Sequence, residues 1–361
     1  MNILYITHLS GFAASGPTYS VPAQISAQAK YDNVFWWNRT DAELDEWKNN
    51  KLFHAKKEYN QKRITNLPSP FNNPDLVVFE DFYYIDDVFR ARECEKRKIP
   101  YIIVPRGALT KQGQSQKKTK KKLANAIFFS HMVKKAAAIQ FLTKKEMIDS
   151  GKKWNAKYFV EPNGINARNK PEKKSSKDKL TCTLIGRFDV YHKGLDLLLD
   201  AVDRLKDKLK DIVEINLYGP ERNGEREEYK AIIKEKRLES IMKVNEGVFG
   251  NEKEDVLRNT EVFIMCSRYE GMPMALIEAM SFGIPCLVTE GTNMRSVIEE
   301  NKAGWGCDNS SDGLVSAFEQ MIENIPLIGE YGQNAYETSK RYDWDTIAKS
   351  SHSKYEKIVG I

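Results

Sequence analysis

Two cations lie close together in a short segment that follows an apolar run. The segment IGRFDVYHKG begins at Ile185, where that run ends, and carries Arg187 and Lys193 before a helical pattern starts at Leu195. Cations fixed at the end of a strand, near a helix N-terminus, suit a diphosphate group. The segment is not a phosphate-binding loop of the GxxxxGK[ST] type, a pattern that the chain lacks. Taken alone, the pair also fits two surface cations.

Two carboxylates and a glycine-containing turn follow a second apolar run. The segment CSRYEGMPMALIEAMSFGIP starts directly after residue 265 and places Glu270 in a turn and Glu278 on the helix that follows. Backbone N–H groups at the start of a helix favour an anion. Those free to donate here belong to Gly271, Met272 and Met274. Carboxylates accept several hydroxyl hydrogen bonds, so they suit ribose or a hexose. Two exposed glutamates at a helix start are the alternative.

The elements that position these residues follow an α/β pattern, because short apolar runs alternate with amphipathic stretches. Strands are predicted at 2–7, 34–37, 76–79, 101–104, 138–142, 157–160, 180–185, 213–218, 243–246, 262–265 and 285–288. Helices are predicted at 83–98, 119–137, 195–209, 227–237, 274–281 and 312–324. Such alternation predicts parallel sheets covered on both faces by helices.

One polar segment is the best candidate for a domain boundary. Residues 166–179, NARNKPEKKSSKDK, contain almost no large apolar side chain and separate two strand-like runs. We therefore expect domains at 1–165 and 166–343, with a final helix at about 344–361 packed back on the first. Ligands bind at the carboxyl ends of strands in such sheets, so we expect the active site in a cleft between the halves.

The distribution of charge indicates what kind of partner the chain binds, and the spacing of its cysteines indicates a redox compartment. The net charge is +6, yet residues 106–176 contain 18 Lys and Arg against 4 Asp and Glu. This region implies an anionic partner: nucleic acid, a membrane surface or a phosphorylated substrate. No RNA-binding motif accompanies it, which disfavours nucleic acid. The widely spaced Cys94, Cys182, Cys266, Cys286 and Cys307 fit buried apolar residues in a reducing cytosol. No apolar stretch reaches the ~20 residues of a membrane span.

Several blocks occur in an order and spacing typical of one enzyme family. Glu270 and Glu278 form an E-x7-E pattern followed by A-M-x-x-G-x-P, and Arg187 and Lys193 belong to a G-R-x-x-x-x-K-G block with one extra residue. Supporting blocks are Pro162, Asn163 and Gly164; Tyr218, Gly219 and Pro220; and Gly247, Val248 and Phe249. Through them the chain resembles the group 1, GT4-type retaining glycosyltransferases. The resemblance implies a GT-B fold, two Rossmann-like doubly wound domains that face each other across a cleft.

The resemblance also implies roles for these residues. Arg187 and Lys193 would neutralise the donor diphosphate in place of a metal, so no metal or cofactor is expected and the substrate is a UDP- or GDP-linked sugar. Glu278 would bind the ribose hydroxyls, and Glu270 the hydroxyls of the transferred sugar. Further donor contacts are expected from the backbone of Gly271, Met272 and Met274 and, around the base, from Val248 and Phe249.

The N-terminal half departs from the family pattern at two places. The usual Gly-Gly loop is replaced by a stretch in which Gly11 and Gly16 are separated, and Gly16 is still expected near the donor phosphate. Pro105, Arg106 and Gly107 stand where many members have a histidine. This P-R-G resembles enzymes of bacterial capsule and exopolysaccharide clusters. Arg106 is expected to assist a donor or acceptor phosphate, with a surface turn arginine as the alternative.

Together these features predict a metal-independent hexosyltransferase of surface polysaccharide biosynthesis. It would move a sugar with retention to a hydroxyl of a lipid-linked glycan, without an enzyme nucleophile. Lysines at 117–122 would hold it on the inner face of the cell membrane, as a cytoplasmic peripheral protein. His8, His131 and His192 are interpreted as structural or incidental. The alternatives are a sugar-nucleotide epimerase of the same fold and a basic membrane- or nucleic-acid-binding module with an inactive enzyme-like half.

Overall fold

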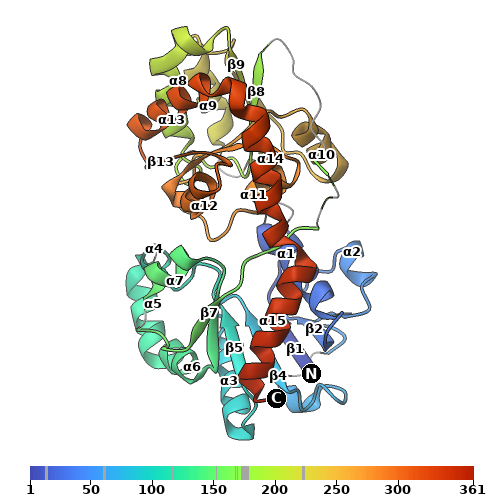
Figure 1. Cartoon of the computed structure of the whole chain (residues 1–361). Coiled ribbons are helices and arrows are strands. Elements are labelled where there is room, and N and C mark those ends of the chain that lie inside the picture. The colour runs from blue at the N-terminus through green and yellow to red at the C-terminus, as the bar shows by residue number, and fades with distance from the viewer. Residues whose placement is uncertain are drawn as a thin grey trace. The chain divides into compact units, whose positions relative to one another are not determined.

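The chain folds into two compact units, each built on one parallel sheet. The computed structural model describes residues 1–12, 15–59, 62–115, 117–151, 153–166, 168, 170–171, 179–221 and 224–361. One unit comprises Met1–Gly164 and Trp344–Ile361, and the other comprises Ile165–Asp343 (Figure 1). Of the predicted boundary segment 166–179, residues 167, 169 and 172–178 lie outside the described residues.

The first unit has a seven-stranded sheet in the order β3-β2-β1-β4-β5-β6-β7, with every pair parallel. Its strands are β1 (Asn2–Thr7), β2 (Asn33–Asn38), β3 (Phe53–His54), β4 (Leu76–Glu80), β5 (Tyr101–Val104), β6 (Ala138–Phe141) and β7 (Tyr158–Val160). Its helices are α1 (Gly16–Gln28), α2 (Asp45–Lys48), α3 (Ile85–Arg97), α4 (Lys111–Ser115), α5 (Lys118–Ala124), α6 (Ser130–Lys135), α7 (Lys144–Ser150) and α15 (Trp344–Val359). A π-helical turn, η2 (Asn125–Phe129), joins α5 to α6.

The second unit has a six-stranded sheet in the order β10-β9-β8-β11-β12-β13, again parallel throughout. Its strands are β8 (Leu180–Ile185), β9 (Val213–Tyr218), β10 (Met242–Asn245), β11 (Val262–Met265), β12 (Cys286–Thr289) and β13 (Gly304–Cys307). Its helices are α8 (Leu195–Leu209), α9 (Glu225–Glu235), α10 (Gly250–Arg258), α11 (Met274–Ser281), α12 (Arg295–Glu300), α13 (Ser311–Glu323) and α14 (Ile328–Ser339).

Both sheets are doubly wound, which confirms the predicted fold class. Strands β4, β11 and β12 are buried along their whole length, and strands covered on both faces read as continuous apolar runs. The first unit has its core around Phe35, Trp37 and Phe79, and the second around Leu198, Ile215 and Phe318. Each core therefore lies between one sheet and its own helices.

The C-terminal helix α15 packs on the first unit. It lies against α1 (Figure 1). Its Trp344, Ile347 and Ala348 form an apolar cluster with Ala27 of α1. Farther along the helix, the buried Tyr355 donates to Gln140 Oε1 of β6 at 3.1 Å. Within the described ranges, no helix is both long and apolar enough to cross a membrane. The five cysteines are free and buried, as the sequence predicts.

Candidate functional site

Two loops meet at the point where the strand order of the second sheet reverses. Strands β8 and β11 are neighbours there, although the chain visits β9 and β10 between them. The loop 186–194 follows β8, and the loop 266–273 follows β11. Ligands of open α/β sheets bind outside the carboxyl ends of the strands at such a point. The topology thus brings the predicted cations and the first predicted carboxylate to one place.

Close backbone packing between the two loops explains why a glycine stands at position 194, at the end of the G-R-x-x-x-x-K-G block. Gly194 has a φ of +64°, and a Cβ built on it would lie 2.0 Å from the carbonyl oxygen of Cys266. Across the same contact, the Arg268 N–H donates to His192 O at 2.9 Å. A larger residue at position 194 cannot fit without moving the second loop, so this glycine fixes the distance between the loops.

Lys193 and Glu270 form a partly buried ion pair. Lys193 Nζ lies 2.5 Å from Glu270 Oε1, and their side chains are 13% and 15% exposed. The Ser267 hydroxyl donates to the same oxygen at 2.8 Å. Burial opposes ionisation of Glu270, but the Lys193 ammonium outweighs it and lowers the pKa of the carboxyl. Glu270 is therefore ionised at neutral pH, and the ion pair with Lys193 joins the two predicted residues.

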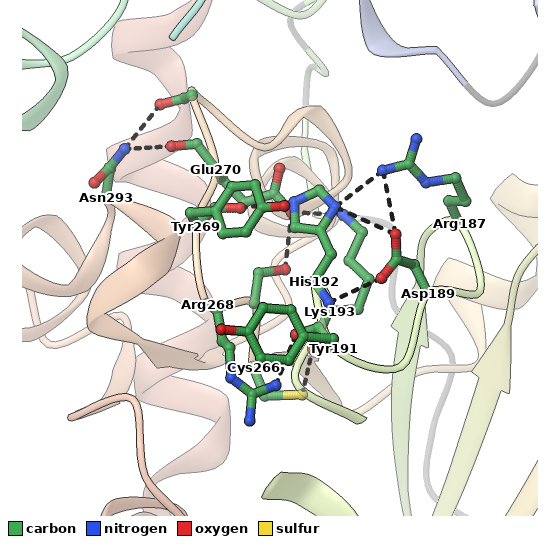
Figure 2. A network of polar contacts seen from close by, with 12 residues as sticks. Arg187, Asp189, Tyr191, His192, Lys193, Cys266, Arg268, Tyr269, Glu270 and Asn293 are labelled. Atoms are coloured by element: carbon green, nitrogen blue, oxygen red, sulfur yellow. Dashed lines mark hydrogen bonds and ion pairs between the residues drawn. The ribbon is translucent and has the colours of Figure 1, made fainter. Parts of the chain in front are cut away.

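His192 lies between Arg187 and the second loop (Figure 2). Its Nδ1 is 2.9 Å from Arg187 Nη2, and its Nε2 is 2.8 Å from the carbonyl oxygen of Tyr269. The imidazole stacks on the Tyr269 ring, with 4.2 Å between centroids and 16° between planes. The ring of His192, interpreted from the sequence as structural or incidental, thus contacts a predicted phosphate-binding cation directly.

Glu278 lies on α11 and pairs with a cation that the sequence analysis did not single out. Its carboxylate contacts the ammonium of Lys253, which lies on α10. Helix α10 directly follows the predicted base-framing residues, of which Val248 is buried and Phe249 is 41% exposed. Helix α11 thus contributes Glu278, and the segment around the start of α10 contributes Lys253 and the exposed ring of Phe249.

The turn between Glu270 and α11 is fixed by hydrogen bonds to Gly291 and Asn293, which follow β12. Glu270 N–H donates to Gly291 O at 2.8 Å, and Asn293 Nδ2 donates to the carbonyl oxygens of Glu270 and Gly271. Among the described residues, the N–H groups of Gly271 and Met274 have no hydrogen-bond acceptor. Space is also open around Gly271, where an added Cβ meets no atom within 4 Å. Two of the three predicted backbone donors are therefore available to a ligand.

The two predicted residues of the first unit have different surroundings. Gly16 begins α1, with nothing within 4 Å of an added Cβ, while the neighbouring residues 13–14 of the predicted loop lie outside the described residues. Arg106, at a φ of +46°, is nearly buried. Its guanidinium donates to Glu80 Oε2 at 2.9 Å, to Asn163 Oδ1 at 3.3 Å and to Gln24 Oε1 at 3.3 Å. It is therefore no surface turn residue.

Sequence reasoning missed four residues of the site. They are His192, Lys253, Ser267 and Asn293. The first directly precedes Lys193 in the loop, so its position alone could have flagged it. Ser267 lies three residues before Glu270, which it contacts, and Asn293 lies 23 residues after it. Lys253 lies on α10, whereas its partner Glu278 lies on α11. In the part of the chain that the structure describes, no group of three or more His, Cys, Asp or Glu side chains is arranged to bind a metal ion.

A family model matches this unit, and curated relatives match about half of the chain. The model for "Glycosyl transferases group 1" matches residues 166–338. A phosphatidyl-myo-inositol mannosyltransferase of Mycolicibacterium smegmatis is 26% identical over 184 residues, which are 50% of this chain and 46% of that protein. A GDP-mannose:cellobiosyl-diphosphopolyprenol alpha-mannosyltransferase of Komagataeibacter xylinus is 25% identical over 201 residues, 55% of this chain and 50% of that protein. These matches span about half the length of each relative.

Solved structures match the whole chain in fold. Sucrose-phosphate synthase from Thermosynechococcus elongatus superposes with a TM-score of 0.73 at 14% identity, covering 100% of both chains. HepE of Anabaena in complex with UDP gives a TM-score of 0.73 at 16% identity, covering 99% of this chain and 100% of that one. At such identities the likeness concerns the fold, and it confirms the GT-B architecture.

Proposed function

Because residues 166–338 match the model for group 1 glycosyl transferases, we propose that the chain is a member of that family and moves a hexose-type sugar from a nucleotide-sugar donor to an acceptor hydroxyl. The observation that carries the proposal is the Lys193–Glu270 ion pair beside Arg187, at the strand-order reversal of the second sheet. One relative is named a GDP-mannose:cellobiosyl-diphosphopolyprenol alpha-mannosyltransferase, and one structural neighbour was solved in complex with UDP. Both nucleotides therefore belong in the donor panel.

The diphosphate replaces Glu270 as the partner of Lys193. In the free chain one lysine ammonium is shared with a carboxylate at 2.5 Å. A donor diphosphate carries more charge and competes for the same ammonium, with Arg187 as a second cation. Glu270 is then left with the Ser267 hydroxyl and accepts hydroxyls of the transferred sugar. As the sugar–phosphate bond breaks, charge grows on the leaving diphosphate, and the two cations stabilise it without a metal.

In the proposed binding mode, the base and ribose of the donor lie near the start of α10. The exposed Phe249 ring offers a face for a base, and Glu278 offers acceptors for the ribose hydroxyls once Lys253 shares or leaves its carboxylate. The open N–H groups of Gly271 and Met274 complete the donor contacts.

Transfer with retention proceeds on one face of the sugar. Retaining hydrolases need a second carboxylate as nucleophile, whereas Glu270 is held by Lys193 and Ser267. In the proposed step the bond from the anomeric carbon to the phosphate oxygen breaks while the bond to the acceptor oxygen forms on the same face. The acceptor proton passes to the leaving phosphate oxygen.

The acceptor is proposed to be a lipid-linked glycan at an anionic membrane surface, in surface polysaccharide biosynthesis on the cytoplasmic side. Lysines 117, 118, 120 and 122 are exposed around α5, with Leu123 at 63% and Ile127 at 53% exposure beside them. Lys121 instead donates to Gly113 O at 2.5 Å. Phe129, at the end of the π-helical turn that follows α5, is buried in the core. Basic residues beside exposed apolar ones suit anionic lipid.

A transfer assay tests the proposal. The protein, freed of metal with EDTA, is incubated with UDP-, GDP- and ADP-sugars and vesicles that contain a polyprenyl-diphosphate glycan. We expect release of one nucleoside diphosphate that depends on the acceptor, and a product whose anomeric configuration, measured by NMR, matches the donor. Donor conversion without acceptor would instead indicate an epimerase. Vesicle binding with no turnover of any donor would indicate a binding module.

A further inference from the structure

His192 makes two hydrogen bonds whose direction the chemistry of the partners determines. The Tyr269 carbonyl oxygen can only accept, so His192 Nε2 must carry the proton and donate at 2.8 Å. The Arg187 guanidinium can only donate, so His192 Nδ1 must be unprotonated and accept at 2.9 Å. The two contacts together require the neutral ring with its proton on Nε2.

Other contacts hold the imidazole in this orientation. The His192 N–H donates to Asp189 Oδ1 at 2.9 Å, the His192 carbonyl accepts from Arg268 N–H, and the ring stacks on Tyr269 (Figure 2). Backbone and ring are thus fixed by both loops, so the lone pair of Nδ1 points at Arg187 before any ligand arrives.

We infer that His192 is a positioning residue that orients the Arg187 guanidinium for the donor diphosphate. The inference rests on the proposed function, in which Arg187 contacts that diphosphate. Arg187 is otherwise weakly restrained, since its ion pair with Asp189 spans 3.7 Å. A guanidinium held in advance loses less rotational freedom when the diphosphate binds and when charge grows on it.

The charges around the ring fit a neutral histidine. From its own loop it faces Arg187, Lys193 and Asp189, and from the loop after β11 it faces Glu270 at 3.9 Å. Burial lowers the pKa of His192, with Lys193 and Arg187 adding to the effect and Glu270 opposing it. The acceptor on Nδ1 is therefore present at neutral pH.

Two substitutions separate the bond to Arg187 from the bond to Tyr269. In His192→Asn, an amide oxygen takes the place of Nδ1 and can accept from Arg187, while the bond to Tyr269 is lost. In His192→Gln, the longer amide keeps a donor near Nε2 and loses the acceptor at the δ position. We expect the Asn variant to keep donor turnover within a few-fold of the unsubstituted protein, and the Gln variant to lose about tenfold in kcat.

A mutant cycle and a spectrum complete the test. In the background of Arg187→Met, the Asn and Gln variants should have equal kcat, because His192 acts through that arginine. The second unit contains no other histidine. The imidazole signal that is present in the NMR spectrum of the unsubstituted protein and absent from that of His192→Asn therefore belongs to His192. Its nitrogens should show a protonated Nε2 and an unprotonated Nδ1. His54→Gln, on the first unit, is the matched control.

The opposite order of the two variants, with Gln active and Asn impaired, would overturn the inference, as would a proton on Nδ1. Unchanged donor binding in Arg187→Met would instead overturn the proposed function. The two failures are therefore distinguishable.

Discussion

At the scale of single residues, the site consists of charges that are already paired in the free chain. Lys193 is bound by Glu270, and Lys253 is bound by Glu278. A nucleotide sugar offers both kinds of replacement partner, because its diphosphate suits the lysine and its hydroxyls suit the carboxylates. In the proposed function, donor binding is therefore an exchange of partners, and each pair makes a separate prediction.

Replacing Lys193 with Met should destabilise the fold in a pH-dependent way. Lys193 lowers the pKa of Glu270 below its usual value of 4.5, so the pair stabilises the folded state above that pH and loses its effect as pH falls. The variant leaves a mostly buried carboxylate unpaired and should lose about 2–3 kcal/mol at pH 7. The deficit should shrink toward pH 4, as protonation removes the charge.

Urea unfolding from pH 4 to pH 7 measures this difference. The control is Lys230→Met, which removes an exposed pair with Glu227 and should cost little at any pH. A deficit in Lys193→Met that stays constant with pH would contradict the role given to the pair.

Replacing Lys253 with Met should strengthen the binding of an uncharged nucleoside about two- to fivefold, because it releases Glu278 from an ion pair whose side chains are 24% and 31% exposed. Glu278→Gln should weaken the same binding. NMR titration with uridine and guanosine measures both effects, and Lys243→Met, which removes a pair with Glu214 elsewhere on the sheet, is the control. Weaker nucleoside binding in Lys253→Met would show that Glu278 is not the ribose acceptor.

At the scale of elements, close packing of the loops after β8 and β11 sets the site's geometry. Gly194 stands against the Cys266 carbonyl, whereas Gly271 faces open space. These two glycines, from two different motifs, therefore serve different purposes. Gly194 allows the two loops to approach each other, and Gly271 leaves open space beside the turn.

Substitution of each glycine by Ala should separate these purposes. Gly194→Ala meets a backbone oxygen at 2.0 Å at a positive φ, and should cost more than about 1 kcal/mol of stability. Gly271→Ala should leave stability within about 0.5 kcal/mol and raise the KM for the donor. Urea unfolding and donor kinetics distinguish the two. Equal stability losses in both variants would contradict the assignment.

The sequence predicts the elements best where burial is continuous. Strands β5 and β11 have the predicted bounds, because apolar runs covered on both faces are recognisable without knowledge of their neighbours. The two missed strands carry weak signals: β3 has two residues, and β13 reads GWGC. The helix predicted at 119–137 is interrupted by a π-helical turn at Asn125–Phe129, a change of hydrogen bonding that periodicity does not reveal.

The candidate site was predictable to the same degree. Arg187, Lys193 and Glu270 follow strand ends, so their types and positions could be read locally. Their contacts with other segments could not, because the Tyr269 carbonyl that binds His192 lies in the loop after β11 and Asn293 follows β12. The setting of Arg106 was equally hidden, since Glu80 and Asn163 lie 26 and 57 residues from it in the chain.

At the scale of the whole molecule, charge is divided between the units. The excess of lysine gathers in residues 106–176, whereas the rest of the chain carries net negative charge. On the first unit the exposed lysines around α5 accompany exposed Leu123 and Ile127. This surface, proposed to dock on anionic lipid, makes a prediction of its own.

Replacing lysines 117, 118, 120 and 122 with Gln should weaken binding to anionic vesicles about 10²- to 10³-fold, at about 1 kcal/mol for each lysine. Vesicle sedimentation with and without anionic lipid measures the effect. The matched control replaces four exposed lysines of the second unit, at 206, 208, 210 and 230. Equal losses in both variants would show that net charge, and not this surface, determines binding.

The most direct test of the central claim, that Lys193 exchanges Glu270 for a donor diphosphate, is calorimetric titration with UDP, GDP and ADP in EDTA. We predict that one of these nucleotides binds without metal, and that Lys193→Met weakens its binding about 10- to 100-fold, the loss expected for a hydrogen bond to a charged group. Binding of none of the three, or equal affinity of the variant and the unsubstituted protein, would contradict the account.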